Sequence, residues 1–247
     1  MKTAAIVQAR IGSTRLPGKI FKDLCGMPVL WHVVNRLSHS KFLNKIIVAT
    51  TTLPEDDIIE KFCTENNILF SRGSSEDVLS RYYEAAKKFE TKIIIRITSD
   101  CPVIDPQILD KMIEEFITTS KAEKLDYMSN SVQRTFPRGF DAEIFTFAVL
   151  EKIFNEAVQT YEREHVTPYI YQHPEIFRIK NFAGEKDYSF HRWTVDTPED
   201  YELIKKIYES LYDPQRIFLF NDILKLFDRE PGLIGINQNI KQKQLGE

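Results

Sequence analysis

Short runs of β-branched and other apolar residues alternate with longer segments of helical period along the first half of the chain. The short runs predict strands at residues 4–9, 45–50, 68–72 and 92–98. The longer segments predict helices at residues 28–37, 54–66, 76–90 and 106–117. Strands and helices in this order are typical of an α/β protein with a mostly parallel, doubly wound sheet covered by helices.

The alternation changes at about residue 125. A well-signalled helix is expected over 197–212, because Thr197 can cap it, Pro198 suits its first turn and Asp200 lies three residues after the cap. The residues from 237 onward are expected to fray. The other expected elements are loop and strand over 126–145, helices over 146–158 and 162–172, and strands over 177–183 and 188–195.

Composition and charge narrow the function. Lys and Arg number 33 and Asp and Glu 36, so no general positive field exists to hold nucleic acid or an anionic membrane, and any anion site must be local. Three widely spaced cysteines without a C-x-x-C pair argue against a disulfide framework or a zinc site. The apolar start is too short for a signal peptide, and no run approaches the roughly 20 residues that span a bilayer. A cytoplasmic protein is expected.

The segment "VQARIGSTRLPGKIF", residues 7–21, follows the first strand and carries three cations, Arg10, Arg15 and Lys19. It is not a P-loop, because five residues separate Gly12 from Gly18 and the position of the magnesium-binding hydroxyl is an isoleucine. A sharply turning loop with cations and free backbone N–H groups can hold a polyphosphate. A solvated basic loop is the alternative, but open α/β sheets bind ligands at this edge.

Several motifs together resemble the cytidylyltransferases that make CMP-activated sugar acids. The two specific ones are "VQARIGSTRLPGKIFKDLCGMPVLWHVVNRL" and "RWTVDTPEDY". Those between them resemble the branch of spore coat polysaccharide biosynthesis proteins: "RGSSEDVLSRYYEAA", "TSDCPVIDP", "SNSVQRTFPRGFDAEIF" and "REHVTPYIY". The resemblance covers most of residues 3–203.

This resemblance implies a three-layer, Rossmann-like sheet of the nucleotide-diphospho-sugar transferase type with a small β/α excursion. It implies one domain over 1–247, with a nucleotide-binding half at 1–124 and an acceptor-binding half at 125–212 that could also form a homodimer contact. Residues 213–247 would be a C-terminal extension.

Two aspartates stand at predicted strand ends. Asp100 closes the fourth strand, and Asp196 closes the strand expected over 188–195. Mg²⁺ is usually held by one or two carboxylates together with substrate phosphates. The resemblance assigns both residues to magnesium, and we expect their unliganded carboxylates to repel each other. The alternatives are a turn residue and a helix cap. Arg96, on the same strand face as Asp100, needs an anion, either a buried carboxylate or a phosphate.

Asp141 and Glu143 lie two residues apart and share a face if they are in a strand. Arg138, Arg192 or His191 could lie between them, but a polyhydroxylated or amine-bearing acceptor is favoured because the family's acceptor pocket is expected here. The expected acceptor-binding residues are Asp141, Glu143, Arg163, His165 and Arg192. The expected nucleotide-binding residues are Arg10, Gly12, Ser13, Arg15, Lys19, Arg72, Ser75 and Arg96.

The sequence therefore predicts an Mg²⁺-dependent cytidylyltransferase. It would transfer CMP from CTP to a sugar acid or small phosphorylated acceptor in surface polysaccharide biosynthesis and release pyrophosphate. The expected catalytic residues are Arg10, Lys19, Asp100 and Asp196. One alternative is a nucleotide-sugar glycosyltransferase that uses residues 141–143 as a D-x-D-like metal motif, and another is a non-catalytic nucleotide-binding protein.

Overall fold

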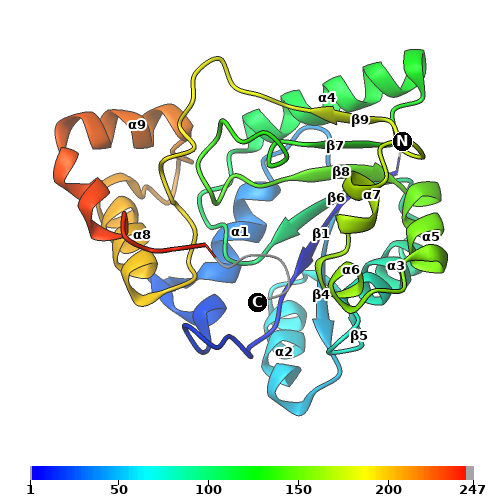
Figure 1. Ribbon diagram of the computed structural model, residues 1–247. Coiled ribbons are helices and arrows are strands. Elements are labelled where there is room, and N and C mark those ends of the chain that lie inside the picture. Colours follow the sequence, from blue (N-terminus) through cyan, green and yellow to red (C-terminus); the bar gives the residue numbers. More distant parts are fainter. Residues whose placement is uncertain (1, 243–247) are drawn as a thin grey trace.

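Seven strands form one sheet in the computed structural model, which describes residues 2–242 (Figure 1). Their order is β5-β4-β1-β6-β8-β7-β9. The first four in this order are parallel, β8 runs antiparallel to both β6 and β7, and β9 is parallel to β7. The strands are β1 (Thr3–Gln8), β4 (Lys45–Thr51), β5 (Leu69–Gly73), β6 (Ile93–Thr98), β7 (Tyr127–Ser129), β8 (Glu143–Thr146) and β9 (Ile179–Asn181). A small hairpin joins β2 (Asp23–Leu24) to β3 (Met27–Pro28).

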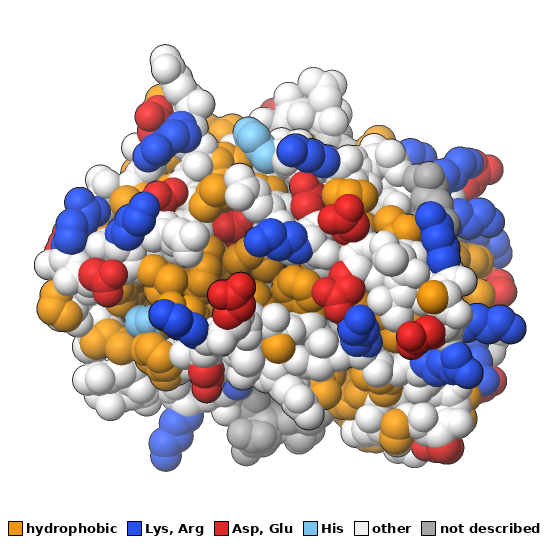
Figure 2. Space-filling view, turned by 90° about the horizontal axis from the view of Figure 1, so that it is seen from above, with side chains coloured by type: hydrophobic (Ala, Val, Ile, Leu, Met, Phe, Trp, Pro, Cys, Tyr) orange, Lys and Arg blue, Asp and Glu red, His pale blue; other side chains and the backbone are white. Residues whose placement is uncertain are grey.

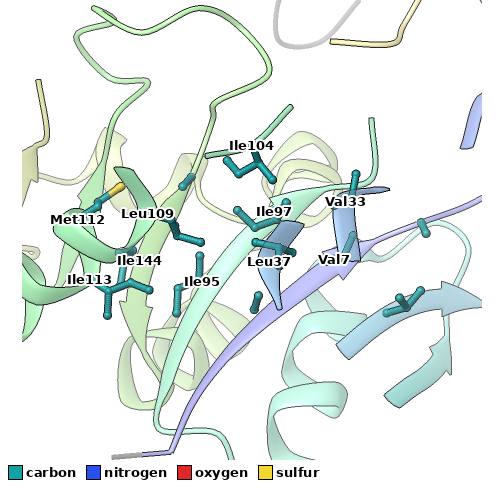
Figure 3. Close-up of a cluster of buried hydrophobic side chains, with 14 of the residues drawn as sticks. Val7, Val33, Leu37, Ile95, Ile97, Ile104, Leu109, Met112, Ile113 and Ile144 are labelled. Atoms are coloured by element: carbon teal, nitrogen blue, oxygen red, sulfur yellow. The ribbon is translucent and has the colours of Figure 1, made fainter. Parts of the chain in front are cut away.

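Helices cover both faces of the sheet, because successive strand residues point to opposite sides. Val7 and Ile95 pack under α1 (Val29–Leu37), α2 (Asp57–Glu65) and α4 (Pro106–Glu123), in the cluster that Figure 3 shows. Ile6 and Ile94 face the opposite layer, in which α3 lies against α5 and α6. The helices of that layer are α3 (Val78–Lys88), α5 (Phe147–Glu156), α6 (Thr160–His165) and α7 (Pro168–Gln172).

A third core lies beside the sheet, under α8 (Pro198–Leu211) and α9 (Phe220–Arg229), which stand at the left of Figure 1. Its centre is the fully buried Trp193, which contacts Phe140, Phe220 and Phe227. The cluster also takes Leu16 from the loop after β1 and Leu233 from the short helix η3 (Pro231–Ile236). Two further single-turn helices are η1 (Lys19–Phe21) and η2 (Pro54–Asp56). This core therefore joins the start of the chain to its last helices.

The first half of the prediction is confirmed: the four parallel strands and their helices lie within a few residues of the expected bounds, except that α4 runs six residues beyond its expected end at 117. The capping box of α8 is also confirmed, since the Thr197 side chain accepts from the Asp200 amide and the Asp200 carboxylate accepts in return.

Three expectations are wrong. The strand over 188–195 forms a single bridge, between Arg138 and Arg192, because Trp193 and Val195 pack into the third core instead of pairing along a sheet. The helix over 162–172 is two short helices, divided at Val166, whose φ is +73°. The tail does not fray at its start, since Asn237 is buried and donates to the Arg192 carbonyl; residues 243–247 lie outside the described part.

On the face seen in Figure 2, acidic and basic side chains are interspersed around groups of hydrophobic ones. This agrees with the near balance of charges in the composition. Among residues 2–242, no helix is both long enough and apolar enough to span a bilayer.

Candidate active site

A cavity of about 1000 Å³ opens at the carboxyl ends of the parallel strands. The loop after β1, the end of β6 and the segment before α8 all contribute to its wall. This is the edge at which open α/β sheets bind ligands. The charged residues lining it are Arg10, Arg15, Lys19, Arg81, Asp100, Arg134, Arg138, Glu164 and Asp196.

The loop after β1 is fixed at several points. Its start bonds to β4, where the Ala9 amide donates to the Ala49 carbonyl at 3.1 Å. The Ile11 amide donates to the Asp56 carboxylate at 2.7 Å, and Leu16 is buried in the third core. Gly18, with φ of +65°, turns the chain into η1, a conformation that glycine adopts at little cost. The loop is thus held in place while its cations face the cavity.

Lys19 binds both candidate metal ligands. Its Nζ lies 2.6 Å from Oδ2 of Asp100 and 2.8 Å from Oδ1 of Asp196, and Arg15 also pairs with Asp196. Burial lowers the pKa of Lys19, but the two carboxylates outweigh it, so the pKa is raised. Burial raises the pKa of Asp100, but Lys19 and the Thr98 hydroxyl stabilise its charged form and lower the pKa overall. The two carboxylates are therefore brought together, and a shared ammonium neutralises their repulsion.

The sequence suggested that Asp196 ends a strand, but the described part of the structure has no strand directly before it. The Val195 amide and the Thr194 hydroxyl both donate to the Asp100 carbonyl, at 2.8 and 2.9 Å. These hydrogen bonds hold the segment that carries Asp196 next to the segment that carries Asp100. Arg192 was expected to bind the acceptor, but it lines neither this cavity nor the second one described below. Its Nη2 is 3.3 Å from Asp196, and its Nε donates to the fully buried Asp200 at 2.9 Å. Arg192 thus supports Asp196 and the start of α8.

A second cavity of about 420 Å³ adjoins the first. The two share the lining residues Thr98, Ser131, His165 and Tyr171. Of the residues expected at the nucleotide or the acceptor, Arg96, Asp141, Glu143 and His165 line this second space. Burial lowers the pKa of His165, so its ring is neutral at pH 7. The joined spaces can hold a nucleotide and a second molecule side by side.

The acidic pair in this second cavity has partners from the protein. Glu143 binds Arg96 through one oxygen and accepts from the Tyr127 and Thr167 hydroxyls, both at 2.6 Å, through the other. Asp141 is held by both terminal nitrogens of Arg134. Arg96 and Arg134 therefore neutralise this pair, and not Arg138, Arg192 or His191 as considered from the sequence. The anion that Arg96 binds is the buried carboxylate of Glu143.

Besides Arg192, three expected site residues line neither cavity. Arg72 pairs with Asp57 and Glu60 of α2, at 2.7 and 2.6 Å. Arg163 pairs with the Asp77 N-cap of α3 at 2.6 Å, and Ser75 contributes its carbonyl to an arginine side chain. The structure gives these residues partners within the protein, and their binding roles stay predictions.

Arg81, Arg134 and Arg138 also line the large cavity. The sequence reasoning missed Arg81 and Arg134, and it considered Arg138 only as a cation between Asp141 and Glu143. Arg81 is 3% exposed and donates to the Ser74 carbonyl at 2.6 Å. A charged residue within a helix is usually solvated, so the sequence shows little sign that Arg81 is buried. The one signal was the nearby Gly73, and the structure explains it, because a Cβ there would lie 3.0 Å from the Arg81 side chain. Across residues 2–242, no ion pair includes Arg10, Arg81 or Arg138. The cavity therefore has uncompensated cations for an anionic ligand.

A doubly wound sheet with a strand-end cavity that contains uncompensated cations and paired carboxylates is typical of α/β enzymes that bind anionic ligands. The chain belongs to the cytidylyltransferase family, whose profile matches residues 4–223. It is an enzyme of that class.

Individual relatives agree with this. The chain is 35% identical over 250 residues to an uncharacterized protein of Methanocaldococcus jannaschii, covering 100% of this chain and 99% of that one. It is 33% identical over 233 residues to the spore coat polysaccharide biosynthesis protein SpsF of Bacillus subtilis, covering 92% and 94%. A solved cytidylyltransferase from Leptospira borgpetersenii superposes with a TM-score of 0.90 at 38% identity, covering 99% of this chain and 100% of that one.

Proposed function

We propose that this enzyme transfers CMP from CTP to a sugar acid or small phosphorylated acceptor in glycan biosynthesis, with Mg²⁺, and releases pyrophosphate. The observation that carries the proposal is the cluster of Lys19, Asp100 and Asp196 in one cavity with uncompensated arginines. Family membership supports the cytidylyl group, and the name of the Bacillus relative supports a role in polysaccharide synthesis.

The carboxylate pair fits a magnesium ion. Oxygens of Asp100 and Asp196 both lie within 3 Å of the Lys19 ammonium, so one cation already bridges them. Within residues 2–242, no three His, Cys, Asp or Glu side chains gather to form a metal site. The protein would therefore supply two carboxylates and the nucleotide the remaining oxygens, which is the usual arrangement for Mg²⁺. When bound there, Mg²⁺ supplies Lewis-acid polarisation of a phosphoryl oxygen.

The chain's own cations would orient and stabilise the triphosphate. In the proposed reaction an acceptor oxygen attacks the α-phosphorus in line, the new P–O bond forms, and the bond to the β-phosphate breaks. If the acceptor oxygen is a hydroxyl, its proton passes to solvent water. Arg10, Arg15 and Lys19 would bind the β and γ phosphates and stabilise the charge that develops on pyrophosphate. Positioning and charge neutralisation suffice for such a transfer, so no general base is assigned.

The second cavity would hold the acceptor. Because Arg134 and Arg96 already bind Asp141 and Glu143, these carboxylates would orient polar groups of the pocket rather than bind a bare cation. Arg138 lines the adjoining large cavity, and burial and nearby Arg134 lower its pKa. An anionic group on the acceptor would relieve that unfavourable environment, which supports a carboxylate or phosphate.

The glycosyltransferase alternative receives no support from residues 141–143. A metal ion at Asp141 would have to displace Arg134 from both carboxylate oxygens, whereas among residues 2–242 the only ion-pair partner of Asp100 is Lys19. Glu143 is 6% exposed and each of its oxygens has a protein donor.

Two measurements test the proposal. Thermal melts with Mg²⁺ and each nucleoside triphosphate should show the largest rise with CTP, since a ligand at 100 times its dissociation constant adds about 2.7 kcal/mol. Pyrophosphate release should then appear when CTP is combined with one member of a panel of sugar acids and small phosphates. Equal stabilisation by ATP, GTP and UTP would remove the cytidine assignment, and no stabilisation by any of them would remove the triphosphate site.

A further inference from the structure

We propose that Lys19 has two alternative partners. In the ligand-free enzyme its ammonium occupies the place between Asp100 and Asp196 where the divalent cation would bind. When metal and nucleotide arrive together, Lys19 leaves the carboxylates and binds the triphosphate. This inference rests on the proposed function, and it predicts that the free metal ion binds weakly until CTP is present.

The geometry of the ligand-free site carries the first step. The Lys19 side chain is 13% exposed, and its Nζ contacts one oxygen of each aspartate at 2.6 and 2.8 Å. Asp100 and Asp196 are also the two residues that would hold the metal ion. The ammonium and a divalent cation therefore compete for one position.

The charges of the cluster carry the second step. Asp100, Asp196 and Asp200 provide three negative charges, and their ion-pair partners Lys19, Arg15 and Arg192 provide three positive ones. The cluster is therefore neutral as a whole, and a free divalent ion would add two positive charges to it. A bare metal ion gains little there, because Asp100 and Asp196 each already have a cation partner.

A triphosphate changes this balance. Its negative charge offers Lys19 and Arg15 new partners, and each cation that moves to a phosphate frees a carboxylate oxygen for the metal. Lys19 suits such an exchange, since lysine is a compact charge on a flexible four-carbon stem. Arg192 cannot follow it, because its guanidinium also binds the buried Asp200. Metal and nucleotide should consequently bind with strong positive coupling.

The experiment is a titration of the enzyme with Mn²⁺, in which the free ion is counted by electron paramagnetic resonance with and without CTP. Wild type should bind Mn²⁺ weakly alone and at least about tenfold more tightly with CTP. Lys19→Met should bind Mn²⁺ alone about tenfold or more tightly than wild type, since Asp100 then loses its cation and Asp196 keeps only its two arginines. Lys19→Arg keeps a cation and should stay weak. Lys61→Met, on exposed α2, is the control.

The outcomes separate this inference from the proposed function. If wild type binds Mn²⁺ alone as tightly as with CTP, or if Lys19→Met binds it no better than wild type, the inference is wrong while the function stands. If neither CTP nor Mn²⁺ binds in any combination, the proposed function itself is wrong. Melting curves check each fold, and Lys19→Gln replaces Lys19→Met should that variant not fold.

Discussion

Asp196→Asn removes the charge at the centre of the ion cluster while keeping the shape of the side chain. Asp196 is the acid partner of Lys19, Arg15 and Arg192. The sequence alone suggested that removing one of two repelling carboxylates would leave the metal-free protein as stable or slightly more so. The structure predicts the opposite sign, because no repulsion is left to relieve.

The expected loss of stability follows from the ion pairs that each cation keeps in the variant. Lys19 keeps Asp100 and Arg192 keeps Asp200, whereas Arg15 has no other ion pair among the described residues. The net loss is therefore about one charge-assisted contact, or about 1.5–3 kcal/mol. For a protein of this size that lowers the melting temperature by about 3–12 °C.

The assay is a thermal melt with chelator and without nucleotide, beside turnover and CTP affinity for the same variant. Asp228→Asn, which changes an exposed carboxylate on α9, is the matched control and should melt like wild type. Turnover of Asp196→Asn should fall far more than CTP affinity, because the charge matters most as the phosphorus is attacked. A wild-type melt would refute the ion-cluster argument, and near-normal turnover would refute the metal role.

Three further results are expected. Arg10→Met, at an exposed side chain, should weaken CTP binding about tenfold without changing the melt, and calorimetry showing unchanged affinity would contradict its role. Gly139→Ala should cost about 3 kcal/mol or more, because its Cβ would lie 2.1 Å from the Trp193 carbonyl at φ of +102°; Gly232→Ala, in open space, is the control for urea unfolding. Burial lowers the pKa of His32 to about 4, so its neutral form stabilises the fold fully above pH 6.5 and progressively less toward pH 4. Urea unfolding between pH 6.5 and pH 4 should show a smaller loss of unfolding free energy for His32→Gln than for wild type. An equal loss in the two proteins would contradict the role of His32.

The parallel half of the fold was predictable because each of its signals is local. A β-branched run such as 93–98 identifies its own strand, and Thr197 with Asp200 identifies the start of α8. An alternation of apolar residues, by contrast, indicates which side chains are buried but not whether the segment pairs with a strand. The strand expected over 188–195 failed for this reason, since Trp193 is buried against helices rather than in a sheet.

The candidate site was predictable only in part. Residues of the first loop and Asp100 reach the cavity because they follow strands, and the ends of parallel strands meet at one edge. The choice of partners was not predictable, because Lys19 contacts carboxylates 81 and 177 residues further along the chain. No local pattern shows which cation will lie nearest to which acid.

The third core has a consequence for how the enzyme is made. Leu16, in the loop after β1, is buried in the same cluster as Leu226 of α9 and Leu233 of η3. Synthesis proceeds from the N-terminus, so the loop leaves the ribosome long before the residues that cover it. Contacts over such a sequence separation also form slowly. The nascent parallel sheet can therefore fold early, but the loop after β1 is packed in its final position only when α9 and η3 have been translated.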